Sequence, residues 1–188
     1  MRTFVAIELD DECRRKLASA IDNLRRAVPR VRWVKPGGAH LTVKFIGEID
    51  ESGLPAVLEA LTAPAAAARP FLMSCAGIQA FPPRGPLRVI HAPLEEPMGA
   101  LESLVRAVDE GLAEGNGLAR ERRSFRPHVT LGRVKRPRDC PPLDEIADCA
   151  GGTDFGSVRV TDMVLMQSQR TMQGGGYAAL AHLPFGVA

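Results

Sequence analysis

The sequence has no long apolar run and no obvious export signal. No apolar stretch approaches the roughly 20 residues that a membrane-spanning helix needs, so we expect no membrane association. In the stretch MRTFVAIELDDE at the start, the apolar run is too short for a secretory signal, and acidic residues follow it too closely. We therefore expect a cytoplasmic protein.

Cysteine and histidine are too sparse to indicate a disulfide framework or a metal site. The four cysteines include no C-x-x-C pair, and we interpret them as free thiols of a reducing compartment. The four histidines belong to no H-E-x-x-H motif and no cluster with carboxylates. We expect neither a metal nor another cofactor.

The chain also lacks an excess of charge of one sign, because its formal net charge is only +2. The distribution is less even than the total. Eight basic residues lie within one short segment: Arg120, Arg122, Arg123, Arg126, Arg133, Lys135, Arg136 and Arg138. A local basic surface attracts phosphate groups, although a solvated basic loop is the simpler interpretation of the segment taken alone.

A length of 188 residues suits one domain, or two small lobes that share a core. Apolar spacing predicts helices at about 11–28, 54–67 and 98–114, with a short helical piece near 143–150. The first of these has its apolar stripe at Leu17, Ile21, Leu24 and Val28. Strands are expected from the alternating or apolar runs at residues 2–9, 39–47, 70–78, 86–94, 126–134, 157–168 and 177–183, and a short strand ending in a turn is expected within 29–38. QGGGY is the expected turn before the last strand.

This order favours an α+β fold with antiparallel sheets, in which helices pack on the outside. Each half of the chain contains strands, an amphipathic helix and one strand with the pattern H-x-T. There is no strict sequence repeat, so any duplication is one of architecture. We expect a single bilobal domain over residues 1–188, in which each lobe offers its H-x-T strand to a shared cleft.

The two H-x-T patterns are the most informative feature of the sequence. HLTV begins at His40 and HVTL begins at His128. Side chains alternate between the faces of a strand, so His40 and Thr42 share one face while Leu41 and its apolar neighbours pack in the core. The second motif repeats this arrangement. A single such histidine is more often a satisfied strand-edge residue, but with four histidines in 188 residues chance predicts well under one triplet.

Two histidines that face each other across a cleft can act as an acid and a base. The ordinary pKa of histidine, about 6.5, allows it to take or give a proton at neutral pH, and each such group contributes about 10²–10⁴ in rate. A threonine hydroxyl beside each histidine can donate to an anionic oxygen. The pattern therefore indicates phosphodiester chemistry, in which one histidine activates water and the other protonates the leaving sugar oxygen.

The segments RTFVAIEL, VRWVKPGGAHLTVKFIGEI, FRPHVTLGRV and SQRTMQGGGYAALAHLPF resemble the two-histidine (2H) phosphoesterases, specifically the RNA 2′,3′-cyclic phosphodiesterases formerly named 2′-5′ RNA ligases. The resemblance implies two antiparallel sheets facing a central cleft. It also implies metal-independent hydrolysis of an RNA 2′,3′-cyclic phosphate to a 2′-phosphate end. On this chain it implies His40 as general acid, His128 as general base, and Thr42 and Thr130 as phosphate ligands.

Phe45 and Arg133 each follow their histidine by five positions. In similar enzymes these positions hold the nucleoside or the phosphate, and both residue types can stack on a base. Strict alternation places them on the face opposite the histidine, so the prediction requires a bulge or strand end near Gly47 or Gly132. The alternatives are core packing for Phe45 and a solvated surface position for Arg133.

Other candidates have weaker sequence support. His91 and His182 lack a threonine partner, so we interpret them as structural. Alternation places Lys44 on the His40 face, although a solvated position is an equal alternative. Two further residues near the last hairpin, Ser168 and Tyr177, are candidates to line the cleft.

Two other functions use the same residues. In the first, the cleft joins a cyclic-phosphate end to a 5′-hydroxyl and gives a 2′-5′ linkage, because ligation and hydrolysis differ only in the attacking hydroxyl. In the second, the protein binds an RNA end or nucleotide without turnover. The expected partner in each case is RNA with a 2′,3′-cyclic phosphate end or a cyclic nucleotide, and we expect the protein to be a monomer.

Overall fold

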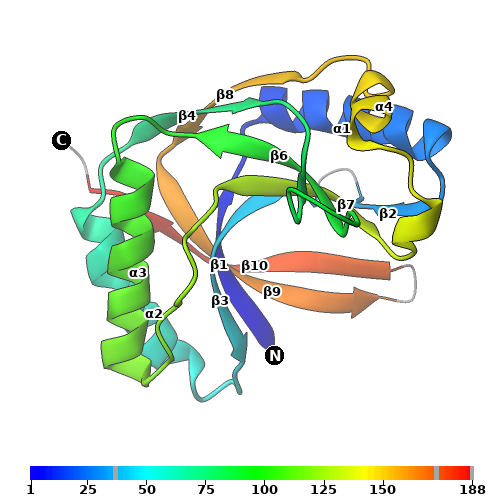
Figure 1. Cartoon of the computed structure of the whole chain (residues 1–188). Helices are drawn as coiled ribbons and strands as arrows, with labels where there is room; N and C mark the ends of the chain where they lie inside the picture. The colour runs from blue at the N-terminus through cyan, green and yellow to red at the C-terminus, as the bar shows by residue number, and fades with distance from the viewer. Residues whose placement is uncertain (36–37, 172–173, 187–188) are drawn as a thin grey trace.

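The structure is a computed structural model that describes residues 1–35, 38–171 and 174–186 (Figure 1). Four α-helices occupy α1 Asp11–Ala27, α2 Leu54–Ala67, α3 Ala100–Asn116 and α4 Leu143–Asp148, and a single 3-10 turn covers Pro137–Asp139. The strands are β1 Arg2–Glu8, β2 Val31–Trp33, β3 His40–Glu48, β4 Phe71–Ala76, β5 Gln79–Phe81, β6 Val89–Glu95, β7 His128–Val134, β8 Asp154–Val160, β9 Asp162–Thr171 and β10 Gly174–Pro184. None of the described helices is both long enough and apolar enough to cross a membrane.

The strands form two antiparallel halves that meet at the two H-x-T strands. The order along the sheet is β10-β9-β1-β3 followed by β7-β6-β4-β8, with β2 paired to β7 and β5 paired to β6. Only one Cα pair, Leu41 with Val129, joins β3 to β7. The predicted α+β class with antiparallel pairing is confirmed, but the two expected sheets are joined at the H-x-T strands into one curled ten-stranded sheet.

The helices cover the outer faces of the two halves. α2 and α3 pack on each other and on β10 and β3, whereas α1 packs on β8 and β2 in the other half (Figure 1). The chain thus crosses between the halves repeatedly, and a single large cluster of buried apolar residues runs through both. This continuous core holds β3 and β7 at a fixed position relative to each other.

The first helix shows how local sequence fixes these elements. The Asp10 side chain caps α1 by accepting a hydrogen bond from the Cys13 amide at 2.9 Å. Acidic residues occupy the first turn and basic residues the last turn, which suits the helix dipole. The predicted stripe is buried, since Leu17, Ile21 and Leu24 have no exposed surface.

Two predictions about the end of the chain are wrong. The single strand expected at 157–168 is two strands, β8 and β9, which belong to different halves of the sheet. No glycine or proline separates them, so the sequence pattern does not reveal the break at Thr161. Gly174 to Gly176, expected in a turn, pair with β9 as the start of β10. Gln173, the first residue of that expected turn, lies outside the described residues.

Candidate active site

The histidines and threonines of both motifs lie on one face where β3 meets β7. Leu41 and Val129, the residues that pair across the joint, are fully buried in the core. His40, Thr42, His128 and Thr130 flank these two residues and are half-buried. Because side chains alternate along each strand, the four polar groups project away from the core, as the sequence predicts.

The two imidazoles are held by the same local hydrogen bond. Nδ1 of His40 lies 2.9 Å from the carbonyl oxygen of Gly38, and Nδ1 of His128 lies 2.7 Å from that of Arg126. A carbonyl oxygen only accepts, so each Nδ1 carries the hydrogen. The neutral ring therefore presents Nε2 as a proton acceptor, and the residue two positions before each histidine fixes the orientation of its ring.

The environment of His40 lowers the pKa of its imidazole. Burial lowers the pKa of His40, the Gly38 carbonyl partly offsets that effect, and the nearby His128 lowers the pKa further. The imidazole of His128 thus lies close enough to His40 to act on its charge. In the free protein the neutral form of His40 is thus favoured relative to an exposed histidine.

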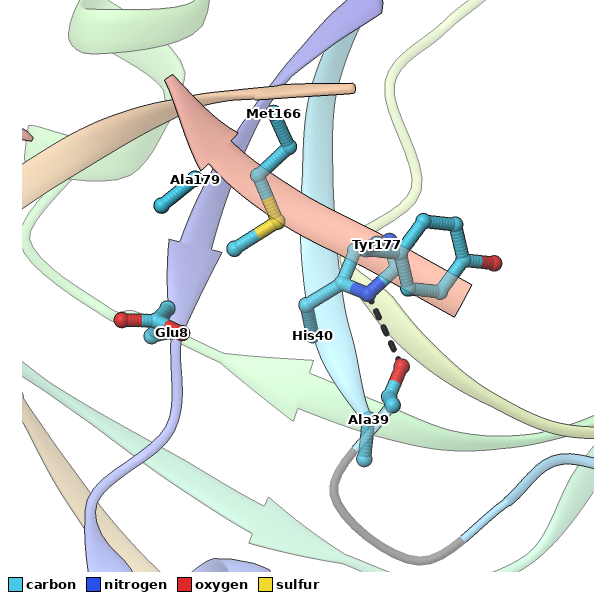
Figure 2. Close-up of a pocket in the computed structure, with 7 residues that line it drawn as sticks. Glu8, Ala39, His40, Met166, Tyr177 and Ala179 are labelled. Carbon is cyan, nitrogen blue, oxygen red and sulfur yellow. Dashed lines mark hydrogen bonds between the residues drawn. The ribbon is translucent and has the colours of Figure 1, made fainter. Parts of the chain in front are cut away.

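Aromatic rings surround His40. Its ring stacks on Phe4 with centroids 5.0 Å apart, and the Tyr177 ring approaches edge-on at 4.8 Å. Figure 2 shows Tyr177 and Met166 beside the imidazole, at a cavity of about 80 Å³ that Glu8, Ala39 and Ala179 also line. Tyr177 is about half exposed, and it borders this cavity together with His40.

Two β-bulges interrupt β3, one at Val43 before Phe45 and one at Ile46 beside Gly47, and the first of them explains the position of Phe45. Ala6 pairs with Thr42 and Val5 with Lys44, so Val43 is an extra residue in β3. The bulge reverses the alternation beyond it. Phe45 is consequently 64% exposed, and its ring lies 6.0 Å from Phe4, which in turn stacks on His40.

The same bulge makes the parity prediction for Lys44 wrong. Its ammonium group forms an ion pair with Asp109 of α3 on the outer face of the sheet and donates to the Ala119 carbonyl at 3.0 Å. Its side chain is only 10% exposed. Lys44 therefore attaches α3 to β3, and it does not face the histidines.

A second bulge brings Arg133 to the face of His128. Ile90 pairs with Gly132 and His91 with Thr130, so Leu131 is an extra residue in β7. Gly132 then faces the core, where an added Cβ would lie 2.7 Å from the Trp33 ring. Arg133 points the other way and is exposed. Bulges of the same kind thus place Phe45 and Arg133, each five residues after its histidine, on the face of the sheet that carries the histidines.

The structure adds His91, which the sequence analysis assigned to a structural role. His91 pairs with Thr130 across β6 and β7, and its ring centroid lies 5.1 Å from that of His128. Phe81 stacks on His91 at 4.1 Å and meets His128 edge-on at 5.1 Å. His91 has no threonine two positions later, so only the strand pairing shows that it borders the site.

His91 is also the most unusual polar group near the site. The residue is 2% exposed, and within the described chain neither of its ring nitrogens has a hydrogen-bond partner. Burial lowers its pKa to about 4, with a further contribution from His128. Its imidazole therefore stays neutral between about pH 4 and pH 6.5, where an exposed histidine is mostly protonated.

The remaining candidates lie away from the two motifs. His182 is exposed and pairs with Asp162 at 3.1 Å, which agrees with a structural role. Ser168 is the strand partner of Tyr177 and is half-buried. Within the described parts of the chain, no group of three or more histidines, cysteines or carboxylates is arranged to hold a metal ion.

Comparison with known proteins places the chain in a family. Residues 13–171 match the 2′-5′ RNA ligase superfamily. A protein of Archaeoglobus fulgidus named RNA 2′,3′-cyclic phosphodiesterase is 35% identical over 96% of this chain and 98% of its own length. A protein of the same name from Methanothermobacter thermautotrophicus is 30% identical, over 94% of this chain and 95% of its own.

Solved structures agree with the sequence comparison. The protein TT0787 of Thermus thermophilus superposes with a TM-score of 0.83 at 28% identity, and 98% of each chain is covered. E. coli LigT complexed with 3′-AMP superposes with a TM-score of 0.75 at 23% identity, covering 98% of this chain and 97% of LigT, which shows a shared fold. The chain belongs to the 2′-5′ RNA ligase superfamily of two-histidine phosphoesterases.

Proposed function

We propose that the protein hydrolyses RNA 2′,3′-cyclic phosphate ends to 2′-phosphate ends, without a metal ion. The observation that carries the proposal is the arrangement of two histidines on one face of the sheet. In each, Nδ1 donates a hydrogen bond to a backbone carbonyl, which leaves Nε2 to exchange a proton with the substrate or with water. A threonine hydroxyl accompanies each of them. The activity named for the similar proteins of Archaeoglobus and Methanothermobacter supports the same reaction.

In the proposed mechanism His128 acts as the general base. Its Nε2 takes a proton from water while the water oxygen attacks phosphorus, and the bond from phosphorus to the 3′ oxygen breaks. His40 gives its Nε2 proton to that 3′ oxygen as it leaves. Thr42 and Thr130 donate hydrogen bonds to the non-bridging oxygens, which carry the negative charge throughout.

His40 must be protonated before it can act as the acid, although its environment lowers its pKa in the free protein. The bound phosphate supplies the compensation, because an opposite charge nearby favours the charged form of histidine. Substrate binding thus raises the pKa of His40 and favours its protonated form. Without substrate the neutral form is favoured. Arg133 and Phe45 border this site, and we propose that they hold the terminal nucleotide by charge and by stacking.

The test uses a short RNA that ends in a 2′,3′-cyclic phosphate, incubated with the protein in EDTA. We expect a 2′-phosphate product, identified by mass and by its sensitivity to phosphatase. His40→Ala and His128→Ala should each lower kcat by about 10²–10⁴. His182→Ala, which removes an exposed histidine outside the site, is the matched control.

Three results would contradict the proposal. Near wild-type rates in either active-site variant would exclude the paired acid and base. A 2′-5′ ligated product as the major species, with excess 5′-hydroxyl RNA, would favour ligation. Tight binding of the RNA without any product would indicate a binding module. We also expect a monomer, which light scattering measures directly.

A further inference from the structure

Two arginines face each other on neighbouring strands close to the histidines. Arg32 of β2 and Arg133 of β7 are Cα partners in register, and such partners project to the same face of a sheet. Val31 and Trp33, on either side of Arg32, are buried in the core. Arg32 therefore points away from the core, onto the same face as Arg133 and the two histidines.

This arginine pair has no acidic partner. Neither guanidinium takes part in any of the salt bridges formed within the described chain, and both residues are exposed. Like charges directly opposite each other destabilise a strand pair. The two arginines therefore lower the stability of the fold, and stability does not explain their presence. A planar guanidinium fork binds phosphate oxygens in pairs, and an RNA chain offers such a group at every nucleotide.

The pair lies beyond the scissile phosphate. On the cleft face of β7 the side chains follow in the order His128, Thr130 and Arg133, because Leu131 is the bulged residue. Same-face residues on a strand are separated by roughly 7 Å. Arg133 is thus about two such steps from His128, and Arg32 lies one strand further to the side. A terminal nucleotide fits between the histidines and this pair.

We propose that Arg32, together with Arg133, binds the phosphodiester that precedes the terminal nucleotide. A cyclic mononucleotide has only the phosphate that the histidines and threonines hold, so it leaves Arg32 without a ligand. An RNA chain supplies a second phosphate for the arginine pair. Arg32 therefore selects RNA chains over cyclic mononucleotides. This inference rests on the proposed function.

The experiment compares kcat/KM for two substrates, a trinucleotide with a 2′,3′-cyclic phosphate end and 2′,3′-cyclic AMP. Arg32→Ala should lower the ratio of trinucleotide to mononucleotide kcat/KM by roughly tenfold, the usual effect of one hydrogen bond to a charged group. Arg106→Ala removes the same charge from an exposed position on α3. That control variant should keep the wild-type ratio.

A chemical change in the substrate locates the contact. We would replace the last internucleotide phosphodiester of the trinucleotide with an uncharged methylphosphonate. The wild-type protein and Arg32→Ala should then cleave this substrate with kcat/KM values within about twofold, because a lone neutral group offers no charge-assisted bond. A full tenfold difference that persists with the methylphosphonate would overturn the assignment, as would an unchanged ratio in Arg32→Ala.

Measurements of RNA binding test the Arg32 subsite independently of the proposed catalytic activity. If the wild-type protein cleaves neither substrate, the proposed function fails, and the subsite is still tested by fluorescence anisotropy with a labelled trinucleotide. Arg32→Ala should weaken binding by about tenfold and reduce the slope of log K against log salt by about one. Equal affinity and equal slope in both proteins would refute the subsite.

Discussion

Replacing His91 with leucine should make the protein more stable. The imidazole is buried and neither nitrogen has a partner in the described chain, and a buried polar group without a partner costs about 1–3 kcal/mol. Leucine is similar in size and removes this cost. It also removes the stacking with Phe81, which contributes about 0.5–1.5 kcal/mol. We therefore expect His91→Leu to raise the free energy of unfolding by about 1 kcal/mol at pH 7.5.

The advantage of leucine should grow as the pH falls. Burial lowers the pKa of His91 from its ordinary value of 6.5 to about 4. Between these two values the unfolded chain holds a proton on His91 that the folded chain lacks, so the wild-type protein loses stability as the pH decreases. Each pKa unit corresponds to about 1.36 kcal/mol, and the full loss is therefore about 3 kcal/mol near pH 4.

The assay is urea unfolding followed by circular dichroism, at several pH values from 7.5 to 4.5. His40 and the carboxylates titrate in both proteins, so the difference between wild type and His91→Leu isolates His91. His182→Leu, which replaces an exposed histidine, should not gain stability at pH 7.5. A lower stability of His91→Leu at pH 7.5, or parallel pH dependence of the two proteins, would refute the reasoning.

Four further results are expected. Asp109→Asn should lower the free energy of unfolding in urea by about 3 kcal/mol, because it leaves the largely buried Lys44 ammonium without an opposite charge. Gly132→Ala should cost about 1–3 kcal/mol by forcing a Cβ against Trp33, whereas Gly176→Ala, where nothing lies within 4 Å of an added Cβ, should cost nothing. Phe45→Ala should change stability by less than about 0.5 kcal/mol but raise KM for RNA by roughly tenfold, through lost stacking on a base. In pH–rate profiles, the limb at which His40 loses its proton should lie at lower pH in kcat/KM than in kcat, because phosphate is present only in the complex; coincident limbs would exclude this role.

The sequence by itself determined the class of the protein and predicted which polar side chains share a face in the two H-x-T strands. The apolar spacing of α1 and the alternation in both H-x-T strands are local properties, and local sterics fix which side chains share a face. His40 with Thr42, and His128 with Thr130, were therefore identifiable without a structure. The resemblance to two-histidine phosphoesterases depended on these same short segments, and the family comparison confirms it.

Tertiary structure decided everything that depends on which strands are neighbours. The bulges at Val43 and Leu131 arise from pairing with β1 and β6, and a bulge reverses the face of every residue beyond it. Alternation alone therefore placed Lys44 on the wrong face. His91 and Arg32 have no motif of their own, and only the pairing of β6 and β2 with β7 places them opposite Thr130 and Arg133. Such pairings join residues far apart in the chain, and the packing of the common core selects them.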